Sequence, residues 1–142
     1  MKGKDENIIV EKSYAFSVRC VKLYKYLSEK EHDYVICKQL LRSGTSIGAN
    51  IKEAIRGYSK ADFASKVGIA LKEASETEYW IELLRDTDYI SRQEADSMLA
   101  DCIEIIKITT SIIKSSKTTP WIKVFSWQPY PLSNNYELWI IN

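Results

Sequence analysis

The sequence has few of the residues that build metal, redox and phosphate-binding sites. Its 142 residues include one histidine and three cysteines, and the cysteines lie far apart with no C-x-x-C pair. This spacing argues against zinc and disulfide-exchange chemistry. The GK[ST] ending of a phosphate-binding loop, the H-E-x-x-H motif of metalloproteases and the G-x-G-x-x-G motif of dinucleotide-binding proteins are also missing. We therefore expect no metal site and no cofactor.

Long apolar runs are absent as well. No segment approaches the roughly 18 unbroken apolar residues of a membrane span, and the charged first six residues are not followed by the apolar core of a signal peptide. Cys20, Cys37 and Cys102 fall on apolar helical positions, as buried reduced thiols do. The sequence thus predicts a cytoplasmic protein without membrane association, and its 45% hydrophobic content suffices for a core.

Apolar residues recur at helical spacing in four segments that are joined by short polar connections. We expect helices over about residues 7–30, 34–56 and 59–88, and a fourth helix from Ser91 onward. Short connections between long helices predict an all-α fold, an antiparallel up-down-up-down four-helix bundle over residues 1–117. The first helix has an apolar stripe of Ile9, Phe16, Cys20, Leu23 and Leu27, which we expect to be widened by Val10, Tyr14, Val21 and Tyr24.

Three helix ends carry recognisable signals. Ser59 fits an N-cap, with Asp62 in the first turn, where the helix dipole favours an acid. Ser91 and Glu94 have the spacing of a capping box. Gly57 suits the C-terminal end of the second helix.

Residues 118–142 differ from the rest of the chain, because they hold all three prolines and three of the four tryptophans. Two stretches, 121–127 and 136–141, have a strand-like composition. We expect an irregular, aromatic C-terminal extension that packs on its own bundle or on a neighbour, or that alternatively docks another protein. Truncation after Lys117 separates these roles, since an unchanged oligomer that loses only a partner excludes packing.

The stretch 42–58 carries Gly44 and Gly48 inside a strongly periodic helical pattern. Glycine in a helix costs about 1 kcal/mol relative to alanine, so an offsetting gain is required. Four residues apart, the two glycines lie on nearly one face and let another backbone or a bulky side chain approach closely. Residues 42–46 also resemble an anion cradle, but they lack the GK[ST] ending and are one residue out of register for a C-x5-R phosphatase motif. We favour packing.

A small polar line runs beside the apolar face of this helix and contains Asn50 and Glu53. The two residues could form a buried hydrogen-bond pair, a contact between subunits or an acid/base site. A buried carboxylate needs a donor, whereas catalysis needs a second reactive group, and the one histidine, His32, is expected in an exposed turn. We therefore predict that the protein is not an enzyme.

Positive charge is concentrated in the first half of the chain. Residues 1–66 contain 13 Lys and Arg against 8 Asp and Glu, a balance of +5, whereas residues 67–117 contain 6 against 10, a balance of −4. A basic surface interleaved with Tyr24, Tyr26 and Tyr58 could hold an RNA or DNA backbone. The alternatives are a solvated surface or a face that meets the acidic helices of a neighbouring subunit. The candidate contacts are Arg19, Lys22, Lys25, Lys38, Arg42, Lys52, Arg56, Lys60 and Lys66.

Several ordered motifs carry a family resemblance: residues 42–54, Phe63, residues 69–78 and the Tyr89-Ile90 ending. They resemble the bacterial four-helix-bundle proteins encoded in large-subunit rRNA intervening sequences, whose relatives are the accessory variability determinant proteins of diversity-generating retroelements. The resemblance covers about residues 7–117 and implies a barrel-like homopentamer without catalytic residues. For the retroelement relatives it implies a basic surface that binds nucleic acid and a reverse transcriptase. The family-typical or glycine positions, all interpreted as structural, are Gly44, Ser46, Gly48, Asn50, Glu53, Phe63 and Glu78.

Our leading hypothesis is a cytoplasmic, non-enzymatic bundle that forms a ring and serves as an RNA-associated, ribonucleoprotein scaffold. The alternative is a protein-interaction adaptor that binds no nucleic acid and uses its charged faces for ring assembly. Two features depart from the family pattern. The chain is nearly neutral, at +1, rather than strongly basic, and its aromatic extension continues beyond the usual family end.

Overall fold

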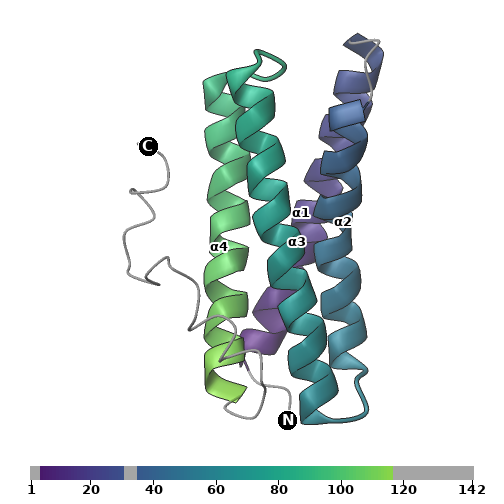
Figure 1. Ribbon diagram of the computed structural model, residues 1–142, viewed down its shortest axis with the longest axis vertical. Helices are drawn as coiled ribbons and strands as arrows, with labels where there is room; N and C mark the ends of the chain where they lie inside the picture. The colour runs from purple at the N-terminus through teal and green to yellow at the C-terminus, as the bar shows by residue number, and fades with distance from the viewer. Residues whose placement is uncertain (1–3, 31–34, 117–142) are drawn as a thin grey trace.

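The computed structural model describes residues 4–30 and 35–116, which form four helices (Figure 1). They are α1 (Lys4–Lys30), α2 (Val35–Ile55), α3 (Lys60–Asp86) and α4 (Arg92–Ser116). Consecutive helices run in opposite directions, which confirms the predicted all-α four-helix bundle. Where the structure describes them, the helix ends lie within about three residues of the predicted ones. His32 and the expected extension 118–142 lie outside the described residues.

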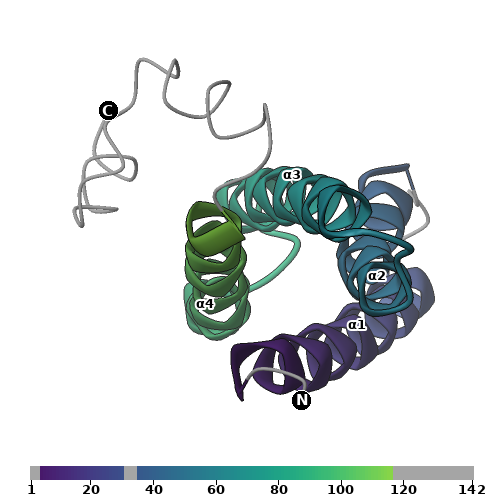
Figure 2. The same cartoon turned by 90° about the horizontal axis from the view of Figure 1, so that it is seen from below.

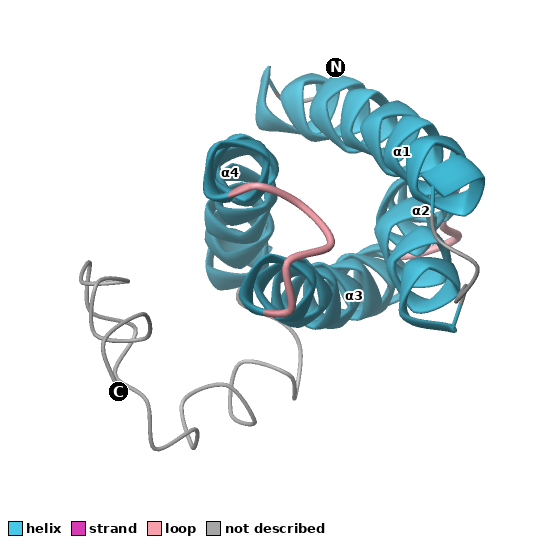
Figure 3. Cartoon of the chain, turned by 90° about the horizontal axis from the view of Figure 1, so that it is seen from above, coloured by secondary structure: helices cyan, strands magenta, loops and turns pink. Residues whose placement is uncertain are grey.

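The helices follow one another around the bundle in chain order (Figures 2 and 3). α2 packs on both α1 and α3, and α3 packs on α4, while α1 and α4 make a smaller contact. One core cluster unites all four helices, and Phe16, Ile47, Ile81 and Ile105 are among its fully buried members. Within the described ranges, no helix combines the length and the apolar content that a bilayer crossing requires.

The buried face of α1 is narrower than the sequence pattern suggested. Ile9 and Phe16 are buried as predicted, but Val10 is 37% exposed and Tyr14 is 72% exposed, so the expectation that these two widen the stripe is wrong. At about 100° per residue, Val10 and Tyr14 lie about 100° and 140° around the helix from Ile9. That rotation takes them away from the core.

The predicted caps are confirmed. The Ser59 hydroxyl accepts a hydrogen bond from the Asp62 N–H at 3.1 Å. At the start of α4, the Ser91 N–H donates to the Glu94 carboxylate at 2.9 Å, and the Glu94 N–H donates to the Ser91 hydroxyl at 3.1 Å. Gly57 follows α2, although without the left-handed backbone that usually favours glycine. A Cβ at Gly57 would instead lie 2.9 Å from Asp62 Oδ2 and 3.1 Å from the Ala54 carbonyl oxygen, so a larger residue would crowd the turn.

Candidate nucleic-acid interface

Gly44 and Gly48 bring α2 into close contact with α1. A Cβ on Gly44 would overlap the sulfur of Cys20 and lie 3.1 Å from its Cβ. A Cβ on Gly48 would lie 2.9 Å from the Ser17 hydroxyl and 3.2 Å from the Ser13 carbonyl oxygen. Real Cβ atoms rarely tolerate such approaches, and the contacts support the interpretation of both glycines as packing positions.

The same run carries two sequence patterns that suggest chemistry, and its place in the helix argues against both. Residues 42–46 lie inside α2, where N–H groups are used within the helix and do not face an anion. The letters from Gly44 to Gly48 also fit G-x-S-x-G, which in hydrolases forms a sharp turn between a strand and a helix. Here all five residues lie inside α2, so Ser46 does not occupy a nucleophile elbow.

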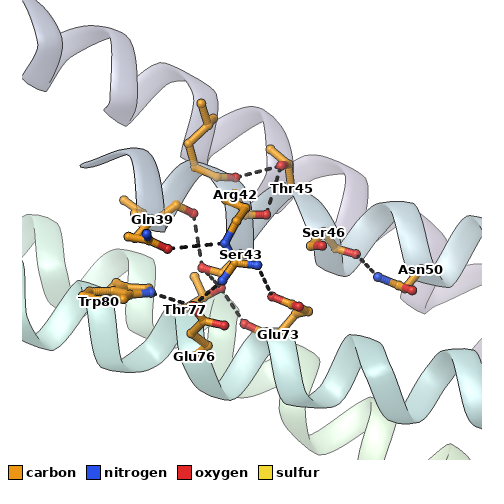
Figure 4. A network of polar contacts seen from close by, with 12 residues as sticks. Gln39, Arg42, Ser43, Thr45, Ser46, Asn50, Glu73, Glu76, Thr77 and Trp80 are labelled. Carbon is orange, nitrogen blue, oxygen red and sulfur yellow. Dashed lines mark hydrogen bonds and ion pairs between the residues drawn. The ribbon is translucent and has the colours of Figure 1, made fainter. Parts of the chain in front are cut away.

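Arg42 reaches across to α3 (Figure 4). Its guanidinium pairs with Glu76 and, at 3.5 Å, with Glu73, and the Trp80 indole N–H donates to the same Glu76 carboxylate at 3.1 Å. The hydrogen bond between Arg42 and Glu76 is the main reason why the pKa of Arg42 is raised and that of Glu76 is lowered. Arg42 is therefore engaged by two acids of its own chain.

A buried polar contact lies beside this ion pair. The hydroxyls of Ser43 and Thr77 are hydrogen-bonded at 2.9 Å, and Thr77 also contacts the Glu73 carbonyl oxygen at 2.7 Å. Both side chains are fully buried. The burial of Thr77 was not predicted, although its spacing from Ala74 and Ile81 places it on the apolar line of α3.

Arg19 and Lys12 connect α1 to α4. Arg19 forms an ion pair with Asp101 at 2.5 Å and donates to the Ser97 carbonyl oxygen at 3.1 Å. Lys12 pairs with Glu104 at 2.9 Å. Basic residues of the first half of the chain thus meet acidic residues of the second half within one molecule.

Asn50 and Glu53 do not bond to each other. The Asn50 amide donates to the Ser46 carbonyl oxygen at 2.8 Å, within its own helix. Glu53 has a 59% exposed side chain and pairs with Lys66 of α3 at 2.6 Å. The required donor for Glu53 is therefore basic, and Lys66 is a paired cation.

Glu78 lies half-buried on α3. Burial is the main reason why the pKa of its carboxyl rises to about 7, and the nearby charge of Glu82 raises it further. Phe63, another family-typical position, is half-buried and packs against the core.

Six of the nine candidate cations remain exposed and have no acidic partner in residues 4–30 and 35–116. They are Lys22, Lys25, Lys38, Lys52, Arg56 and Lys60. The structure therefore divides the predicted basic face into paired cations, which join helices, and unpaired ones, which face solvent. In the same part of the chain, no three His, Cys, Asp or Glu side chains come together as a metal-ligand set.

The comparisons with known proteins agree with this fold. The model of the family described as 23S rRNA-intervening sequence protein matches residues 5–111, a range that begins in α1 and ends in α4. The chain is also similar to a protein with unknown function from the S23 ribosomal protein family, from Bacteroides thetaiotaomicron, for which there is a crystal structure. The two sequences are 54% identical, and the two structures superpose with a TM-score of 0.76. The similarity covers 78% of this chain and 98% of that chain. No curated protein matches.

Proposed function

Because the chain belongs to the 23S rRNA-intervening sequence protein family, we propose that it is a non-enzymatic, self-associating scaffold that binds RNA through its unpaired cations. The observation that carries this proposal is the set of six exposed Lys and Arg side chains without acidic partners in the described residues. A cation that is already paired with a carboxylate gains less electrostatic free energy when it binds a phosphate. When unpaired cations bind phosphates, they displace the counterions that are condensed on the nucleic acid. The release of these counterions drives association.

Two of the unpaired cations, Lys38 and Lys52, lie along one face of α2, and Arg56 lies in the turn directly after the end of this helix at Ile55. Lys52 follows Lys38 by 14 residues, which at about 100° per residue returns it to within about 40° of its direction. Lys38 and Lys52 are then separated by about 21 Å along the helix direction. A line of this length suits several successive phosphates of a nucleic-acid backbone.

Binding of a structured RNA hairpin over a salt series tests the proposal. We expect the triple variant Lys38→Gln/Lys52→Gln/Arg56→Gln to lose affinity and to reduce the slope of log K against log salt by about 2 to 3. A matched control is Lys12→Gln/Arg42→Gln/Lys66→Gln, which removes the same charge from cations held in ion pairs. No binding at low salt, or equal losses in both variants, would contradict the proposal.

Non-enzymatic character is supported by the surroundings of Glu53, which was the best candidate for a general base. This carboxylate is exposed and engaged by Lys66, so it is not set in a buried site where it could accept a proton from a bound substrate. We also infer a cytoplasmic location, because Cys20, Cys37 and Cys102 are free, buried thiols, which suit a reducing compartment.

Self-association is supported by an apolar ridge on α1. Val10, Tyr14 and Val18 follow one another at intervals of four residues and are all exposed. When a second copy of the chain covers this ridge, apolar surface is removed from water, which favours association. A ring closes when the contact joins two different surfaces, and a homopentamer is the assembly we propose.

Mass measurement of the native assembly tests this part. We expect Tyr14→Glu to lower the mass toward the monomer while the far-UV helical signal is kept. Tyr79→Glu is the control, since Tyr79 is an exposed tyrosine of α3 and lies on a different helix from the ridge. A monomeric wild-type protein, or an unchanged mass for Tyr14→Glu, would contradict it.

A further inference from the structure

The turn between α2 and α3 has a tightly held backbone. The Gly57 N–H donates to the Ala54 carbonyl oxygen at 3.0 Å, and the Arg56 N–H donates to that of Glu53 at 3.1 Å. The Tyr58 N–H donates to the Asp62 carboxylate at 3.2 Å. Together with the Ser59 cap and the crowding at Gly57, these bonds give the turn one defined shape at the end of the bundle where α2 meets α3 (Figure 1).

The side chain of Tyr58 projects from this turn without packing on the protein. Its exposure is 103%, that of an isolated residue, whereas Tyr24 and Tyr89 are partly buried against the core. An aromatic ring on an ordered backbone has little freedom to lose when a planar partner stacks on it, because tyrosine has two rotatable side-chain bonds.

The charges around Tyr58 are unbalanced toward the positive. Arg56 lies two residues before the ring and Lys60 two residues after it, and both are exposed without an acidic partner in the described residues. The two nearby acids are engaged: Asp62 accepts from the Tyr58 N–H, and Glu53 pairs with Lys66. An anion approaching the turn therefore meets cations whose charge is not used elsewhere.

We propose that this turn binds an unpaired RNA segment, with Tyr58 stacked on one base and with Arg56 and Lys60 on the adjoining phosphates. The inference rests on the proposed RNA binding and names the part of the RNA that is recognised. A base inside a duplex has both faces covered by its neighbours, whereas an unpaired base offers a face for stacking. An exposed ring with cations on either side suits the unpaired base.

Fluorescence anisotropy tests the inference with two labelled probes, a 12-nucleotide oligoadenylate and an RNA duplex of the same length. We expect Tyr58→Ala to weaken oligoadenylate binding by about 5- to 150-fold, the range for loss of one stacked base. Tyr58→Phe should retain the affinity, because the ring is kept. Binding of the duplex and the salt slope should change little in either variant, since no cation is removed.

Tyr79→Ala serves as the matched control, because Tyr79 is an exposed tyrosine on α3 whose ring packs edge-on against Trp80. Unchanged oligoadenylate affinity in Tyr58→Ala, with wild-type RNA binding intact, overturns the stacking site and leaves the proposed function standing. If the wild-type protein binds neither probe at low salt, both fall. A change in the mass of the assembly without a change in RNA affinity assigns Tyr58 to a subunit contact and overturns the site.

Discussion

Gly44 of α2 lies directly against Cys20 of α1, so closely that a Cβ on the glycine would overlap the cysteine sulfur. Glycine fits this position despite its low helix propensity, because α1 and α2 approach each other closely here. The contact explains why a residue of low helix propensity lies in the middle of a 21-residue helix. It also links a buried thiol to the packing of α1 on α2.

We expect Gly44→Ala to lower the free energy of unfolding by about 1 to 3 kcal/mol, since overpacking outweighs the better helix propensity of alanine. Cys20→Ala removes the overlapping sulfur, so the double variant Cys20→Ala/Gly44→Ala should be more stable than the sum of the two single effects predicts. Urea denaturation of all four proteins measures this coupling. Strict additivity would show that the two positions do not touch.

The capping box at the start of α4 makes a second prediction. Ser91→Ala removes the acceptor of the Glu94 N–H and should cost about 1 kcal/mol of stability. Ser111→Ala is the control, because Ser111 is an exposed residue inside α4, where alanine is favoured. Thermal unfolding measures both, and an equal effect of the two substitutions would contradict a capping role.

The raised pKa of Glu78 predicts how the stability of the folded protein depends on pH. In the folded protein burial raises the pKa of Glu78 from 4.5 to about 7, so between these pH values the folded state holds a proton that the unfolded chain has released. Stability should therefore fall as pH rises from about 4.5 to 7 and then level off. At pH 8 Glu78→Gln should be more stable than the wild type by about 1 to 2 kcal/mol, a value reduced for partial solvent exposure.

Urea titrations from pH 4.5 to 8 measure this effect, and the Glu78→Gln protein should show a flatter profile. Glu29→Gln is the control, because Glu29 is an exposed glutamate on α1. If Glu78→Gln leaves the slope unchanged, the carboxyl is ionised at low pH in the folded state and the prediction is wrong.

The three cysteines should be unreactive in the folded protein. Burial raises the pKa of the Cys20 thiol to about 12 and also raises that of Cys102, so little thiolate forms at pH 8. We expect a disulfide reagent such as DTNB to label the native protein at least about 100-fold more slowly than the protein in guanidinium chloride. Rapid labelling of two or more thiols without denaturant would contradict their burial.

Much of the fold could be predicted, because its signals are local. Helical periodicity, the Ser59 cap and the Ser91–Glu94 capping box each depend on residues within a few positions of one another. The width of the buried stripe on α1 could not be predicted, because Val10 and Tyr14 carry apolar side chains whether or not another helix reaches them. The burial of Thr77 was not predicted for the opposite reason. Its side chain is polar, and nothing in the sequence points to its buried partner Ser43.

The sequence predicted which residue types make up the candidate site, but not how their side chains are arranged in space. The sequence by itself determined the four helices, the glycines at a close helix contact and the excess of cations in the first half of the chain. Only the tertiary structure decided that Arg19, Arg42 and Lys66 bind carboxylates while Lys38, Lys52 and Arg56 face solvent. The reason is physical: charge is a property of one residue, whereas an ion pair depends on which helix faces are brought together.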